Sequence, residues 1–309
     1  MTRVEHPRAE WLAKRRYDES RGGWIMTASD VAGAIGWDVR SFNSPLQVFV
    51  RKKTGKESDE TKVMRNGLLL EPGIAEIFAD ETGQEITPAL KHRLVYHPDV
   101  PWLACTPDFY TWPIDADPAT DKNHPLEIKL IEDFRKMVEF KDGDCPLWLQ
   151  IQLQIQIACL DAQIGEWAAK LPIGFEHGLL ERNDAFIDST IPRLDEFRRR
   201  LENDDPPPPE SPKDLNAIKK LYPLDSGDTV QLDDAMLERV NQWEAVKQGV
   251  KSVNAEKDRL EAKIRAVIGE ATFGLLNDGT MVTLKTIENK GHTTTVAPYS
   301  YRTLRRVKI

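Results

Sequence analysis

The chain has 309 residues, of which 40% are hydrophobic and 30% charged, as in soluble globular proteins long enough to bury a core. Its formal net charge of −8 argues against a protein that coats nucleic acid through a broadly basic surface, although a local basic cleft can lie on an acidic body. No apolar run is long enough for a signal peptide or a membrane span, and the three cysteines lack CxxC spacing, so we expect neither a disulfide framework nor a zinc site, and a cytoplasmic location.

The first expected elements are helices, at 27–37, 44–55 and 66–83. The second begins with Ser44, an N-cap, followed by proline at the first helical position, and it stops at a glycine. The third also ends at a glycine. The chain therefore opens with a helical layer.

Short extended runs follow at 92–97, 102–112 and 126–131, and they predict strands. The segment 148–160 alternates Gln with apolar residues, which fits a strand, but it is long and contains no turn signal. We therefore expect a helix packed on both sides there. A strand hairpin is expected over 166–182.

A closing helix over 184–203 completes a mixed α/β fold, in which helices flank a sheet. The run "LENDDPPPPESP" at 201–212 is the clearest break, because consecutive prolines continue neither a helix nor a strand and favour an extended spacer. We expect a first domain over 1–205, a proline-rich linker over 206–212 and a second module over 213–309.

The second module is expected to contain a long polar helix, at 231–269, and a β-hairpin whose turn is Asp278-Gly279. Apolar residues on the helix are spaced by threes and fours, which is a heptad-like seam. The seam could pack within the chain, form an oligomer or meet a partner, and packing on its own hairpin is slightly preferred. The last residues carry a basic cluster that is either solvated or in contact with DNA phosphates: Arg302, Arg305, Arg306 and Lys308.

Chemistry is concentrated in the expected strands around Asp108, Glu127 and Lys129. Strand alternation places Glu127 and Lys129 on one face, and an adjacent antiparallel strand could bring Asp108 to them. Two carboxylates and an amine suit phosphodiester hydrolysis with a divalent metal, the carboxylates as ligands and the ammonium stabilising developing charge. The Ile128 carbonyl is a further candidate ligand. The alternative is an ordinary solvated strand face.

Six stretches in this order resemble the YqaJ-like viral recombinase family, relatives of phage lambda exonuclease within the PD-(D/E)xK nuclease superfamily. They are "TASDVAGAIG", "SPLQVFVRKKTG", "GLLLEPGIAEIFADETG", "HPDVPWLACTPDFY", "PLEIKL" and "CPLWLQIQLQIQIACLDA". The resemblance implies an Mg²⁺-dependent exonuclease, with Mn²⁺ as a possible substitute, that digests linear double-stranded DNA 5′ to 3′. It also implies a 3′ overhang for a single-strand annealing protein, and a homo-oligomer, a trimer in the best-known relative.

By position, Asp108, Glu127 and Lys129 fill the PD…ExK core of that family, preceded by Thr-Pro. Glu71 matches a carboxylate that the preceding helix contributes, and its alternative is an exposed first-turn glutamate. Gln152 matches the first glutamine of a Q-x-Q segment, whose amide binds phosphate or the nucleophilic water. In a helix Gln152 and Gln156 would share one flank, and the repeated glutamines leave open which of them faces the site.

The resemblance also implies a site for a DNA 5′-phosphate, formed by Ser29 at a helix N-terminus and by Arg21. The spacing of this pair is one residue longer than the family pattern, and a plain N-cap serine and a surface arginine are the alternatives. Two other functions remain open: a PD-(D/E)xK endonuclease of structure-specific or restriction type, and a non-catalytic DNA-end-binding protein.

Overall fold

The structure, a computed structural model, describes residues 8–37, 43–55, 62–112, 123–288, 291 and 298–307. Contacts within the chain divide it into two units, Met1–Tyr222 and Pro223–Ile309. The first unit contains the central sheet and its helices, and the second contains a long helix and a hairpin.

A five-stranded mixed sheet lies at the centre of the first unit, in the order β10-β9-β8-β7-β4. Its strands are β10 Phe175–Glu181, β9 Ile164–Lys170, β8 His124–Leu130, β7 Phe109–Thr111 and β4 Ile86–Pro88. The central strand, β8, runs antiparallel to β7 and parallel to β9. The strand at 126–131 and the hairpin over 166–182 that the sequence predicts are thus confirmed, and they form the middle of the sheet.

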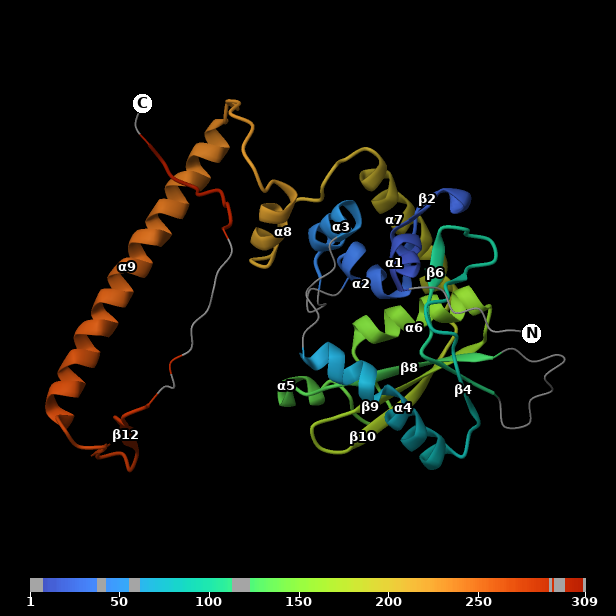
Figure 1. Cartoon of the computed structure of the whole chain (residues 1–309), viewed down its shortest axis with the longest axis horizontal. Helices are drawn as coiled ribbons and strands as arrows, with labels where there is room; N and C mark the ends of the chain where they lie inside the picture. Colours follow the sequence, from blue (N-terminus) through green and yellow to red (C-terminus); the bar gives the residue numbers. More distant parts are fainter. Residues whose placement is uncertain are drawn as a thin grey trace. The chain divides into compact units, whose positions relative to one another are not determined.

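Two helices, α4 Lys62–Thr82 and α6 Leu147–Leu160, cover the two faces of this sheet (Figure 1). Ile74, Ala75 and Phe78 of α4 pack in one cluster with the alternate β8 residues Leu126 and Ile128. Because successive side chains of a strand point to opposite faces, Glu127 faces α6. This alternation decides which helix can complete the site.

Helix α6 is packed on both sides, as its sequence predicts. Leu149 and Leu153 join the cluster that contains the buried Trp167 of β9. Ile151 and Ile155 join a second cluster on the opposite side of the helix. That second cluster includes residues of three further helices, α2 Ala28–Ala34, α3 Pro45–Thr54 and α7 Asp184–Glu202. It also includes residues of a three-stranded sheet, formed by β3 Met26–Thr27, β6 Leu103–Cys105 and β5 Val95–Tyr96.

A short hairpin interrupts the chain between α1, Arg8–Arg16, and β3. It consists of β1 Tyr17–Asp18, a 3₁₀ turn Glu19–Arg21 and β2 Gly23–Trp24. Gly22 and Gly23 have φ values of 85° and 101°, which glycine adopts without steric cost. The hairpin returns the chain to its start, where the Ile25 N–H donates to the Arg16 carbonyl at 3.1 Å. The end of α1 and the start of α2 therefore lie side by side.

The first unit extends beyond the proline run and includes α8, Asp214–Leu221. Ser44, the N-cap of α3, donates to the Asp214 carboxylate, and the buried Ala217 belongs to the cluster around α3. The sequence places the start of the second module at residue 213, whereas in the structure the division falls after Tyr222. A further helix of the first unit is the single turn α5, Phe134–Met137.

The second unit contains α9, Asp234–Ile268, and the hairpin of β11 Phe273–Leu275 with β12 Met281–Thr283. Both elements are predicted from the sequence. The preferred packing of the helix seam on the hairpin occurs only near the helix end, where Leu260 and Ile264 line a pocket with Val282. No residue of α9 is buried, and Val250 in the middle of the seam is 56% exposed.

The C-terminal basic cluster is described in part. Arg306 donates to Asn241 and to Glu244, both at 2.9 Å, within the second unit. Lys308 lies outside the described residues. Within the described part of the chain, no helix is long and apolar enough to cross a membrane.

Candidate active site

Asp108 and β8 meet through the antiparallel pairing of β7 with β8, as the sequence predicts. Asp108 immediately precedes β7, whose first residue, Phe109, lies opposite Leu126. The Ile128 N–H donates to Asp108 Oδ2 at 2.8 Å. This bond fixes the carboxyl of Asp108 at the strand that carries Glu127 and Lys129.

Glu127 is buried, with 3% of its surface exposed, and three side chains donate to it. Gln152 Nε2 donates to Oε1 and Gln156 Nε2 to Oε2, each at 2.6 Å. Lys129 Nζ also donates to Oε1 and forms an ion pair with it. A buried carboxylate needs such donors, because an unpaired buried charge is strongly destabilising.

The glutamines of α6 divide into two pairs with different partners. Gln152 and Gln156 face Glu127 from successive turns of the helix. Gln150 and Gln154 donate instead to backbone carbonyls, each at 2.7 Å. The expected flanks are confirmed. Gln156 was not among the predicted site residues, although its spacing of four from Gln152 was a usable signal.

The carboxyl groups of the site act on one another. Burial and the charges of Glu127 and Glu71 raise the pKa of Asp108 well above its usual range. Burial and the charge of Glu127 also raise the pKa of Glu71, which lies in the middle of α4 and not in a first turn. Burial alone would lower the pKa of Lys129, but the charges of Glu127 and Asp108 outweigh it and raise that pKa. Lys129 is therefore an ammonium next to repelling carboxyl groups.

The donor set fits a divalent cation that prefers hard oxygen ligands. Glu71, Asp108 and Glu127 supply carboxylates whose mutual repulsion a cation would relieve, and the buried Gln156 Oε1 has no hydrogen-bond partner among the described residues. No three His, Cys, Asp or Glu side chains of the described residues already stand in the arrangement of a metal site. In the described part of the chain, Glu127 Oε2 accepts a single hydrogen bond, from Gln156, so it keeps a lone pair that would be available to a metal without any donor moving. The role of the Ile128 carbonyl stays a prediction.

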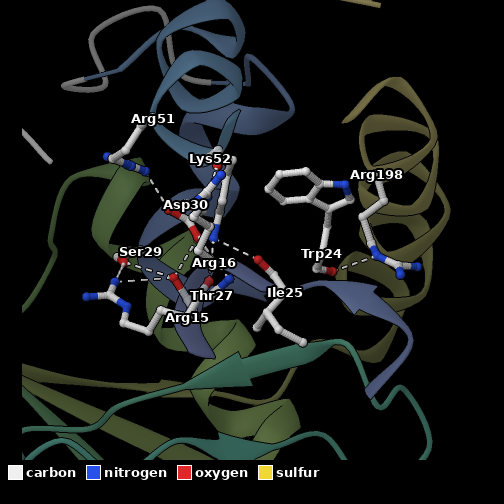
Figure 2. Close-up of polar contacts among 10 residues, drawn as sticks. All are labelled: Arg15, Arg16, Trp24, Ile25, Thr27, Ser29, Asp30, Arg51, Lys52 and Arg198. Atoms are coloured by element: carbon white, nitrogen blue, oxygen red, sulfur yellow. Dashed lines mark hydrogen bonds and ion pairs between the residues drawn. The ribbon is translucent and has the colours of Figure 1, made fainter. Parts of the chain in front are cut away.

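A second polar group lies around Ser29, in the first turn of α2 (Figure 2). Arg15 at the end of α1 donates through one nitrogen to Ser29 Oγ at 2.8 Å and to Thr27 Oγ1 at 3.3 Å. Arg21, the predicted partner of Ser29, lies at the turn of the hairpin with its guanidinium over the Tyr96 ring, 4.2 Å from the ring centre. The guanidinium that contacts Ser29 is thus that of Arg15. The sequence spacing does not reveal this pair, because the hairpin adds residues between Arg15 and Ser29.

Residues 10–163 of the chain match the family model of the YqaJ-like viral recombinase domain. Among solved structures, the chain is similar to the alkaline exonuclease LHK-Exo of Laribacter hongkongensis, with 23% identity over 64% of this chain and 94% of that chain and a TM-score of 0.49. The complex of LHK-Exo with dAMP gives 22% identity, 70% and 98% coverage, and a TM-score of 0.49. The chain is also similar to a phage related exonuclease from Haemophilus somnus 129PT, with 13% identity over 65% of this chain and 89% of that chain and a TM-score of 0.37. A comparison with curated proteins finds no match.

Proposed function

Because residues 10–163 form a YqaJ-like viral recombinase domain, we propose that the chain is a metal-dependent DNA exonuclease of the recombination type. The observation that carries the proposal is the convergence of Asp108, Glu127 and Lys129 on adjacent strands. The raised pKa values of Asp108 and Glu71, beside a protonated lysine, mark an arrangement suited to a metal and a phosphate. The substrate is a linear DNA duplex, and the reaction is hydrolysis of its phosphodiester bonds.

The side chains divide the chemistry between them. A bound Mg²⁺, or Mn²⁺ in its place, would lower the pKa of a water and neutralise charge on the phosphate. Asp108 and Glu127, with Glu71 from α4, would hold the cation. Lys129, an ammonium held on Glu127, would stabilise negative charge that develops on the scissile phosphate. Gln152 keeps Glu127 in place and is available to bind the phosphate or the attacking water.

The proposed polarity is 5′ to 3′, because Arg15 and Ser29 offer a site for the terminal 5′-phosphate. A guanidinium binds phosphate oxygens through a planar fork of donors, and a serine hydroxyl adds one more donor. We assign the guanidinium of this site to Arg15 in place of Arg21. Digestion from that end leaves a 3′ overhang, which a single-strand annealing protein would take up. Assembly as a homotrimer is proposed from the family resemblance.

The proposal is tested by incubating the full-length protein with a linear duplex and with the same sequence as a covalently closed circle, in Mg²⁺ and in EDTA. We expect loss of the linear DNA only in Mg²⁺ and an intact circle. Cutting of the circle would identify an endonuclease. Binding of linear DNA without cleavage in any metal would identify a non-catalytic end-binding protein.

A further inference from the structure

The carboxylate of Asp30, next to Ser29 in α2, is surrounded by cations. Asp30 is buried, and its Oδ2 accepts from the Thr27 N–H at 3.0 Å and from the Thr27 hydroxyl at 2.7 Å. Lys52 Nζ forms an ion pair with Oδ2 at 2.6 Å, and Arg51 forms one with Oδ1. Arg15 contacts the same Thr27 hydroxyl. Two cationic side chains therefore pair with the Asp30 carboxylate, and a third, Arg15, contacts a hydroxyl that is bonded to it.

Lys52 serves to hold the backbone together. It is buried, and its ammonium donates to the carbonyls of Arg15 at 2.8 Å and Ile25 at 2.7 Å (Figure 2). These carbonyls lie on the two sides of the hairpin, so Lys52 joins the segment that carries Arg15 to the segment that carries Ser29. With its ammonium committed to Asp30 and two carbonyls, Lys52 has no role in recognition.

Arg51 differs from its neighbour Lys52 in exposure. The Arg51 side chain is 23% exposed, whereas that of Lys52 is 5% exposed. One nitrogen of the guanidinium donates to Asp30, and a guanidinium carries five N–H donors in all. In Figure 2 the guanidinium groups of Arg51 and Arg15 lie on the same side of Asp30 as the Ser29 hydroxyl. Both guanidinium groups therefore contact the start of α2, Arg51 at Asp30 and Arg15 at Ser29.

The charges of this group do not cancel. Burial alone would raise the pKa of Asp30, but Lys52, Arg51 and Arg15 outweigh it and lower that pKa well below its usual range. Asp30 is therefore ionised. Burial lowers the pKa of Lys52, but the guanidinium groups of Arg15 and Arg51 alone carry one positive charge more than Asp30 offsets. An excess of positive charge at a partly buried position favours a ligand with more than one negative charge, and a terminal phosphate monoester is such a ligand.

This inference rests on the proposed function and adds a residue to its DNA-end site. We propose that Arg51 is a second guanidinium of that site, which binds the 5′-terminal phosphate of DNA together with Arg15 and Ser29. Asp30 orients Arg51 through one N–H donor and leaves the fork directed to the phosphate oxygens. Lys53, two residues after Arg51 in α3, is the natural control, because its ammonium pairs instead with Asp204 at 2.9 Å and the Leu201 carbonyl at 3.3 Å.

The test measures equilibrium binding of the full-length protein to two fluorescent duplexes in EDTA, identical except for a 5′-phosphate or a 5′-hydroxyl. The wild type is expected to prefer the phosphorylated end. Arg51→Ala should weaken binding of that end about tenfold or more and change the 5′-hydroxyl end by less than about twofold, because it removes a charge-assisted contact. Lys53→Ala should keep the wild-type preference.

Arg51→Lys keeps a positive charge beside Asp30 but loses the planar fork of donors, so its affinity for the phosphorylated end should lie between those of the wild type and Arg51→Ala. This variant replaces Arg51→Ala in the test if the alanine variant does not fold. A wild-type preference that survives in both Arg51 variants would overturn the role of Arg51 and leave the DNA-end site of Arg15 and Ser29 in place. Equal weakening at both ends would also overturn it. Absence of any preference in the wild type would remove the DNA-end site itself, and the role of Arg51 with it.

Discussion

Asp108 is the residue on which the proposed chemistry depends most. Among the described residues its carboxyl accepts one hydrogen bond, from the Ile128 N–H, and it lies beside other carboxyl groups, so its loss should cost little stability. We expect Asp108→Ala to lower the rate of duplex digestion at least about a hundredfold, since changing a residue that only orients a metal ligand already costs about 10- to 100-fold. Thermal unfolding should stay close to that of the wild type.

Asp80→Ala, at an exposed position of α4, is the matched control and should digest DNA as the wild type does. An Asp108→Ala protein that remains active would show that the site lies elsewhere.

The raised pKa values of Asp108 and Glu71 predict how metal dependence changes with pH. A carboxyl group with a raised pKa keeps its proton to a higher pH, and a metal must displace that proton to bind. The Mg²⁺ concentration that gives half-maximal digestion should therefore rise as the pH falls from about 8 to about 6. Titrations of Mg²⁺ at both pH values measure this shift, and equal midpoints would contradict it.

At the scale of the element, the buried Lys52 joins three segments of the first unit. Its loss would remove one ion-pair partner from the buried carboxylate of Asp30. Breaking a buried ion pair by removing one partner costs about 3–5 kcal/mol, so Lys52→Met should lower the free energy of unfolding by about that amount. Urea denaturation measures this change.

The double variant Lys52→Met, Asp30→Asn is the comparison that isolates the pair. It should lose less stability than the two single changes added together, because the double variant removes both charges of the Lys52–Asp30 pair and leaves neither of these two buried without the other. A loss of less than about 1 kcal/mol in Lys52→Met is what a solvent-exposed ion pair would give, and it would contradict a buried Lys52–Asp30 pair.

Several elements could be predicted because their signals are local. Ser44 with Pro45 starts α3 and Gly55 ends it in the left-handed conformation, as their residue types indicate. The approach of Asp108 to β8 also followed from alternation and antiparallel pairing. The partner of Ser29 did not, because the hairpin at Tyr17–Trp24 has strands of only two residues and leaves no periodic pattern.

At the scale of the whole molecule, the sequence predicts that a domain ends at the proline run, whereas in the structure α8, which follows this run, packs back on α3. An extended proline spacer can carry α8 back to α3 as readily as it can separate two domains. Sequence composition does not distinguish these cases, since the decisive contacts of Asp214 and Ala217 are made with distant residues. The second unit begins only at Pro223.

This boundary predicts the outcome of truncation. A chain ending at Tyr222 should fold and keep the site around Glu127, whereas a chain ending at Pro209 should be less stable because it lacks α8 and exposes the surface that Ala217 covers. Circular dichroism during heating and DNA digestion by both fragments test this. Equal stability of the two fragments would contradict the assignment of α8 to the first unit.

The central claim, that this chain digests a duplex from its 5′-phosphorylated end, is tested most directly by strand-resolved digestion. A linear duplex carries a different fluorophore at the 3′ end of each strand, and only one strand has a 5′-phosphate. In Mg²⁺ we expect stepwise shortening of the phosphorylated strand from its 5′ end, while its partner stays at full length. Shortening from the 3′ ends, or equal digestion of both strands, would contradict the account.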